Sequence, residues 1–120
     1  MQAHVPEQEL AAAYLFGSAA QGAATPASDL DVGLLLRRRP PSRLSARHFD
    51  LADRLAEAIG RPVDVVLLND APVDLVHRVL RDGVLLTEPD AAARVRFEVT
   101  ARNKYFDLLP HLERYREQRP

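Results

Sequence analysis

The chain contains no cysteine, so it can form neither a disulfide framework nor a thiolate zinc site, and its four histidines do not cluster. It also lacks an excess of either charge, because 16 basic residues oppose 17 acidic ones. A balanced charge creates no field that recruits nucleic acid or an anionic membrane. The composition therefore argues against redox chemistry, and we expect no direct binding of nucleic acid.

Long apolar runs are missing as well. No stretch approaches the roughly 20 apolar residues that span a bilayer, and the N-terminus lacks a basic segment followed by a continuous apolar core. These absences predict a cytoplasmic protein with no membrane partner. A length of 120 residues with 47% hydrophobic residues predicts a single domain over residues 1–120, too small to add a second lobe for a large substrate.

The hydrophobic pattern predicts an α/β (α+β) domain. Strands are expected at residues 13–16, 29–36 and 63–68, with a brief extended segment at 84–87. Helices are expected after Pro6, at 42–59, at 72–81 and from about residue 90, where Pro110 should kink or interrupt the last helix. The strand at 63–68 is nearly all apolar, which is typical of a central strand buried on both faces.

Three aspartates stand in or beside these apolar strands. The alternation of the second strand puts Asp29, Asp31 and Gly33 on one face and apolar residues on the other, and Asp64 lies in the next strand. Burying neighbouring carboxylates costs several kcal/mol unless cations neutralise them. Two Mg²⁺ ions about 3.5–4 Å apart would do so and would stabilise both oxygens of a phosphoryl displacement. We therefore predict that Asp29, Asp31 and Asp64 are catalytic and metal-binding.

A Gly-Ser turn precedes the aspartates. Gly17 and Ser18 follow the first strand, where they would offer backbone N–H groups and a hydroxyl to the outer phosphates of a nucleotide. Gly22 and Ser28, in the loop that follows, are secondary candidates for nucleotide binding. Each of these residues alone could have a purely structural role, in a turn or as a cap. The prediction of a nucleoside triphosphate site depends on their order and spacing.

The order Gly17-Ser18, Gly22, Ser28-Asp29-Leu30-Asp31 and then Asp64 resembles the nucleotidyltransferase superfamily related to DNA polymerase beta. Within it, the small size and the C-terminal stretch ARNKYFDLLPHLERY resemble the minimal MNT-type nucleotidyltransferases, the antitoxins of HEPN/MNT toxin–antitoxin pairs. The resemblance covers nearly the whole chain. It implies a minimal nucleotidyltransferase fold, with a small mixed sheet flanked by helices and a long C-terminal helix.

The resemblance also implies an activity, the transfer of AMP from ATP, with two Mg²⁺ ions, to a tyrosine hydroxyl of the partner. That partner is a HEPN ribonuclease toxin in a hetero-oligomer, and AMPylation silences it. By position, Asp29 and Asp31 would be the pair that bridges the metals and Asp64 the third carboxylate. Gly17 and Ser18 would hold the triphosphate.

One departure and two alternatives stay open. Relatives often carry arginine in the loop after the Gly-Ser pair, where this chain has Ala19 and Gln21. The chain could instead be a non-catalytic antitoxin that occludes its toxin with the terminal helix and its aromatic residues Tyr105, Phe106 and Tyr115. A nucleotidyltransferase for a small molecule of the aminoglycoside type is the third reading, which the short chain disfavours.

Overall fold

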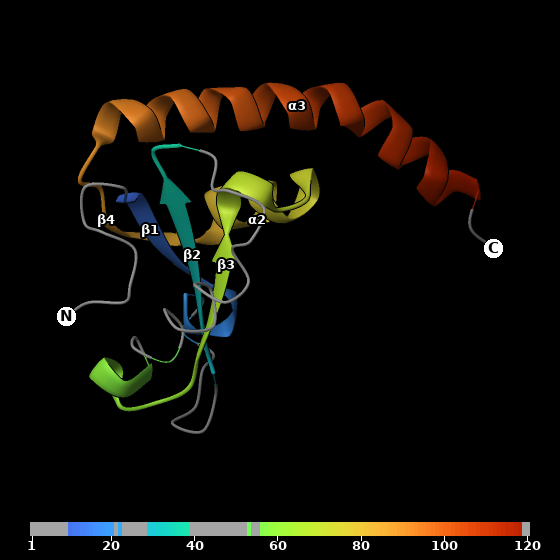
Figure 1. Cartoon of the computed structure of the whole chain (residues 1–120). Helices are drawn as coiled ribbons and strands as arrows, with labels where there is room; N and C mark the ends of the chain where they lie inside the picture. Colours follow the sequence, from blue (N-terminus) through green and yellow to red (C-terminus); the bar gives the residue numbers. More distant parts are fainter. Residues whose placement is uncertain (1–9, 21, 23–28, 39–52, 54–55, 119–120) are drawn as a thin grey trace.

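The chain folds around one mixed sheet (Figure 1). The computed structural model describes residues 10–20, 22, 29–38, 53 and 56–118. The strands are β1 (Leu10–Phe16), β2 (Leu30–Leu36), β3 (Val63–Leu67) and β4 (Val84–Thr87), in the order β3-β2-β1-β4. Strand β1 is antiparallel to β2 and β4, whereas β2 and β3 are parallel. The predicted mixed sheet is confirmed.

Two α-helices have bounds that lie entirely within the described residues. Helix α2 (Val73–Asp82) packs on one face of the sheet, and α3 (Ala91–Gln118) crosses the end where β2 finishes and projects beyond it (Figure 1). Short 3-10 turns follow two strands: η2 (Gly17–Ala19) after β1 and η3 (Leu68–Asp70) after β3. Residues 56–59 are helical, as expected for the end of the helix predicted up to residue 59. The predicted long C-terminal helix is confirmed.

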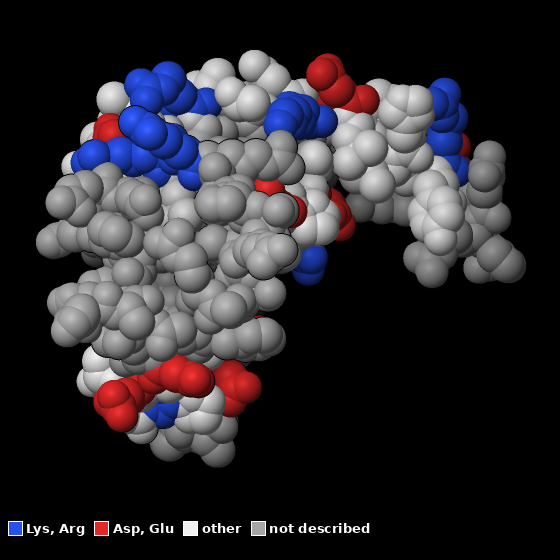
Figure 2. Space-filling model, viewed as in Figure 1, with Lys and Arg blue, Asp and Glu red and all other residues white. Residues whose placement is uncertain are grey.

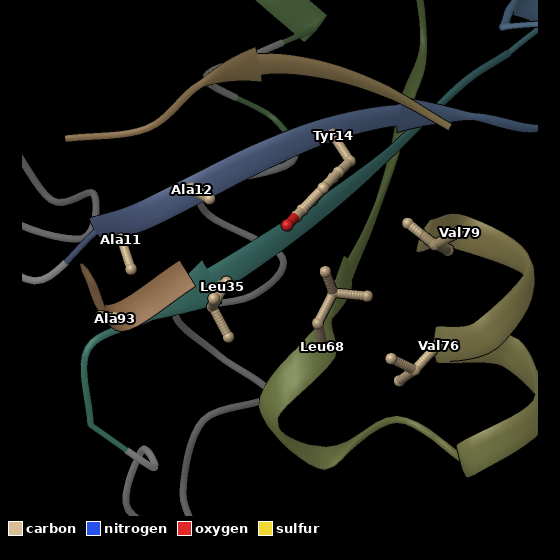
Figure 3. Close-up of a cluster of buried hydrophobic side chains, with 8 residues drawn as sticks. All are labelled: Ala11, Ala12, Tyr14, Leu35, Leu68, Val76, Val79 and Ala93. Carbon is tan, nitrogen blue, oxygen red and sulfur yellow. The ribbon is translucent and has the colours of Figure 1, made fainter. Parts of the chain in front are cut away.

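Apolar side chains cover both faces of the sheet. The face under α2 and α3 carries the cluster drawn in Figure 3, which consists of Ala11, Ala12, Tyr14, Leu35, Leu68, Val76, Val79 and Ala93. The other face carries Ala13, Val32, Leu34, Leu36 and Val65. Strand β2 thus alternates as predicted. Leu35 and Gly33, which lies against Leu68, share the helix-covered face, so Asp31 belongs to that face too.

The start of β1 corrects one prediction. We expected the alanines before residue 13 to end a helix, but the strand begins at Leu10. Ala11 and Ala12 are fully buried, and Ala93 of α3 belongs to the same cluster. Alanine's preference for helix is a weak prior that tertiary packing overrides. Here a small side chain lets the helix lie close to the strand, and Asp90 N donates to Ala11 O at 3.2 Å.

The position of β3 corrects a second prediction. It lies at an edge of the described sheet, not at the centre. Its apolar residues are explained by the two faces, since Val65 packs into the cluster on one side and Val66 against the cluster on the other. A continuous apolar run shows that both faces of a strand are covered. It does not show that the strand has two neighbours.

Helix α3 begins where the sequence predicts. Asp90 caps it, because Asp90 Oδ1 accepts a hydrogen bond of 3.0 Å from Ala93 N. Pro110 does not interrupt it, and the helix continues to Gln118 with a bend along its C-terminal part (Figure 1). Proline removes a single backbone donor, so a helix can bend around it without ending. None of the helices in the described residues is long and apolar enough to cross a membrane.

Candidate active site

Asp31 and Asp64 are neighbours across the sheet. Each is the second residue of its strand, and they are partners in the parallel register of β2 and β3. Adjacent strands lie about 4.8 Å apart, and side chains opposite each other point to the same face. That face is the one that α2 covers. Two carboxylates therefore stand side by side where β2 and β3 begin.

Asp29 joins them at the same end. It lies just before β2, two residues from Asp31, and its side chain is exposed. The start of β2 is tied to the start of β3 by a hydrogen bond of 3.0 Å from Leu30 N to Pro62 O. The structure thus places the three aspartates that the sequence singled out at the same end of the sheet.

The electrostatics of Asp31 reflect this grouping. Burial raises the pKa of Asp31 above its usual range, and the charges of Asp64 and then Asp29 raise it further. All three causes act in the same direction, so each disfavours the ionised carboxylate. A cation placed among the three carboxylates would reverse that effect, because an opposite charge favours the ionised form.

The turn after β1 packs directly on Asp31. Phe16, the last residue of β1, is the register partner of Asp31. Gly17 follows with a φ of 73°, in the left-handed region, and a Cβ on Gly17 would overlap Oδ2 of Asp31. Only glycine allows this approach of backbone to carboxylate. The backbone of the Gly17–Ser18 turn consequently lies beside the carboxylate group, with Ser18 exposed.

The other two loop candidates have weaker support. Gly22 also has a φ of 73°, but nothing lies within 4 Å of a Cβ built there. Its N donates to Ala19 O at 3.3 Å, so it is needed for a turn. Ser28 and Gln21 lie outside the described residues. The proposed roles of Gly22 and Ser28 in nucleotide binding stay predictions.

The donors suit a hard cation that a nucleotide also ligates. Within the part of the chain that the structure describes, no three His, Cys, Asp or Glu side chains are grouped so that they could hold a metal ion. Mg²⁺ usually takes one or two carboxylates together with waters and substrate phosphates, not a cage made only of protein. The carboxylate oxygens of Asp31 and Asp64 are donors of that kind.

Figure 2 shows acidic side chains at the end where β2 and β3 begin and basic ones over the start of α3.

The sequence did not predict two polar contacts that tie the sheet to its neighbouring elements. Asn69 in η3 holds the far end of β2, since its Oδ1 accepts from Leu36 N and its Nδ2 donates to Leu36 O, both at 2.9 Å. The hydroxyl of Tyr14 donates to Glu98 Oε2 at 2.7 Å and so links β1 to α3. These partners are 33 and 84 residues apart in sequence. No local pattern predicts such pairs.

The family follows from comparison with known proteins. Residues 2–92 match the family described as "Polymerase beta, Nucleotidyltransferase". The chain belongs to this nucleotidyltransferase family. No curated protein matches this nucleotidyltransferase in sequence.

Solved structures resemble the nucleotidyltransferase over most of its length. A crystal structure described as the toxin-antitoxin with AMP-PNP is 27% identical with a TM-score of 0.79, covering 95% of this chain and 87% of that one. A mutant MntA-HpeT toxin-antitoxin is 28% identical, with a TM-score of 0.75 and coverage of 92% and 85%. The tri-AMPylated Shewanella oneidensis HEPN toxin in complex with MNT antitoxin is 25% identical, with a TM-score of 0.71 and coverage of 94% and 83%. The predicted resemblance to MNT-type proteins is confirmed.

Proposed function

We propose that this nucleotidyltransferase is an antitoxin that transfers AMP from ATP to a tyrosine hydroxyl of a HEPN ribonuclease toxin. The observation that carries the proposal is the pairing of Asp31 with Asp64 across β2 and β3, with Asp29 two residues away. Similar solved structures support it. One is a toxin-antitoxin with AMP-PNP, and another contains a tri-AMPylated HEPN toxin with its MNT antitoxin.

The chemistry assigns each residue a task. Asp29, Asp31 and Asp64 would hold Mg²⁺, which when bound neutralises negative charge and stabilises the entering and leaving oxygens. Asp64 is exposed, so it can accept the proton of the incoming hydroxyl. The phenolic oxygen forms a bond to the α-phosphorus, the bond from that phosphorus to the bridging oxygen breaks, and pyrophosphate leaves. Gly17 lets its turn lie against the carboxylates and aim backbone N–H groups at the phosphates.

Intact-mass measurement tests the transfer. The purified chain is incubated with ATP, Mg²⁺ and the HEPN toxin proposed as its partner. We expect the partner to gain one or more AMP units, and to gain none with the Asp29→Asn/Asp31→Asn double variant. A partner that stays at its unmodified mass with the wild-type chain contradicts the catalytic proposal.

A second candidate is neutralisation by occlusion alone. Helix α3 favours it, because Val95, Val99 and Phe106 expose about half or more of their surface, at 48%, 47% and 58%. The same double variant separates the two functions in cells that express the toxin. Loss of protection supports transfer as the cause of neutralisation, whereas full protection by the variant means that binding suffices.

A further inference from the structure

Helices α2 and α3 enclose a pocket outside the aspartate site. It has a volume of about 240 Å³ and is lined by His77, Leu80 and Arg81 of α2 and by Ala101, Arg102 and Phe106 of α3. Pockets for small molecules commonly measure about 300–1,000 Å³. This pocket is smaller, so its size suits a single side chain of another protein better than a whole small ligand.

Aromatic rings form one side of the pocket. Tyr105 stacks on His77 with ring centroids 3.5 Å apart and planes within 2° of parallel. The neighbouring Phe106 exposes 58% of its surface, with its ring 6.3 Å from that of Tyr105. The stack holds Tyr105 in place, while Phe106 stays open to a partner. An exposed aromatic ring at a pocket is typical of the few residues that dominate protein–protein binding.

The rim of the pocket is positively charged. Arg81 is neutralised by Asp82, with hydrogen bonds of 3.0 Å from Nε and 2.8 Å from Nη2. Arg102 is exposed and makes no ion pair with any residue that the structure describes. A net positive rim favours carboxylates on the occupant, because complementary charge orients a partner and speeds its association.

The C-terminal end of α2, which contributes Leu80 and Arg81 to the pocket, leads toward the aspartate end of the sheet. The residue after α2, Gly83, packs against Leu15 O of β1, which would be 3.1 Å from a Cβ on Gly83. Val84 is the register partner of Leu15, and the next residue of β1, Phe16, is the partner of Asp31. The pocket and the aspartates also share one face of the sheet. A protein held at the pocket therefore has part of its surface within reach of the carboxylates.

We propose that the α2–α3 pocket is the docking point of the acceptor protein. It receives an apolar side chain from a segment whose carboxylates face Arg102, and this contact delivers the acceptor hydroxyl to the aspartates. The inference rests on the proposed transfer to a protein. It adds the surface that selects the acceptor protein. Binding measurements test that surface separately from the transfer reaction.

Binding to the HEPN toxin proposed as the acceptor tests the pocket. Arg102→Glu and Phe106→Ala are each expected to weaken the complex by about tenfold or more, and Arg102→Lys should bind as the wild type does. The matched control is Arg96→Glu, the same charge change on the same helix. Arg96 lines a separate depression with Arg37, Asn69 and Thr100, so its reversal should change Kd less than about threefold.

Each outcome of these measurements either supports or overturns the proposed docking surface. Wild-type affinity in Arg102→Glu and Phe106→Ala overturns the proposal, as does an equal loss in Arg96→Glu. Sedimentation of the chain alone tests a second copy as occupant, and a dimer that Phe106→Ala dissociates also overturns it. In the transfer assay, Arg102→Glu should raise KM for the protein acceptor and leave KM for ATP unchanged. Normal complex formation without any AMP on the partner removes the proposed transfer but leaves the docking surface intact.

Discussion

Asp31 and Asp64 lie directly opposite each other on parallel strands, with their side chains on the face of the sheet that α2 covers. Burial and the two neighbouring carboxylates raise the pKa of Asp31. The protein alone therefore holds a carboxylate in surroundings that disfavour its charge. Such an arrangement reduces stability and favours binding of cations, which is typical of a functional site.

Asp31→Asn should separate activity from stability. We expect AMP transfer to fall by about 100-fold or more, because the amide cannot replace an anionic ligand. The melting temperature at pH 7 should stay the same or rise slightly, since the substitution removes a charge that burial and Asp64 disfavour. Intact mass of the partner and thermal unfolding measure the two effects. Asp107→Asn, at an exposed position of α3, is the control and should change neither.

The pH dependence of stability gives an independent measurement. The pKa of Asp31 is raised in the folded state, so the folded chain keeps this proton at pH values where the unfolded chain has lost it. The contribution of Asp31 to the unfolding free energy is fully present below its ordinary pKa of 3.8. It is lost as pH rises through the pKa of the folded state. The unfolding free energy of Asp31→Asn should therefore rise relative to that of the wild type as pH rises from about 4 to 7. Urea unfolding at several pH values measures it, and a constant difference contradicts the raised pKa.

Gly17→Ala should damage the site, whereas Gly22→Ala should not. Both glycines have a φ of 73°, so each substitution carries the same backbone strain, about 1 kcal/mol. Only at Gly17 does the new Cβ overlap Asp31 Oδ2, whereas the space around Gly22 is open. We expect similar melting temperatures within a few degrees and a loss of transfer only in Gly17→Ala. Equal activity of the two variants would show that the turn does not need to lie close to Asp31.

The sequence predicts the placement of Asp31 and Asp64 better than it predicts the edges of the fold. Strand alternation places Asp31 on one face, and the pairing with Asp64 needs only that β2 and β3 run in parallel. The alanines before residue 13 were misjudged because their burial comes from α3, about 80 residues later in the chain. The edge position of β3 and the pocket at Phe106 depend on how elements pack. Those arrangements have no signal in a local sequence pattern.

Asn69→Ala should loosen the sheet at the end opposite the aspartates. Asn69 donates to and accepts from the backbone of Leu36, which continues the pairing of β2 after β3 has ended. Losing both hydrogen bonds leaves two backbone groups partly buried and unsatisfied, at a cost of about 1–3 kcal/mol. Asn69→Asp keeps the acceptor for Leu36 N but loses the donor to Leu36 O. Its stability should therefore lie between those of the wild type and Asn69→Ala. Urea unfolding measures all three proteins, and an unchanged Asn69→Ala contradicts this role.

Tyr14→Phe should remove the link between β1 and α3. Tyr14 is 4% exposed, and its hydroxyl donates to Glu98 Oε2 at 2.7 Å. We expect a loss of about 1 kcal/mol in unfolding free energy. Burial and then the hydrogen bond to Glu98 raise the pKa of Tyr14. Its stabilisation is therefore full below the ordinary tyrosine pKa of about 10 and falls as pH rises above it. Unfolding at pH 8 and pH 10.5 should show the wild type losing its advantage over Tyr14→Phe. A difference that is equal at both pH values would mean that Tyr14 ionises as readily in the folded chain as in the unfolded one.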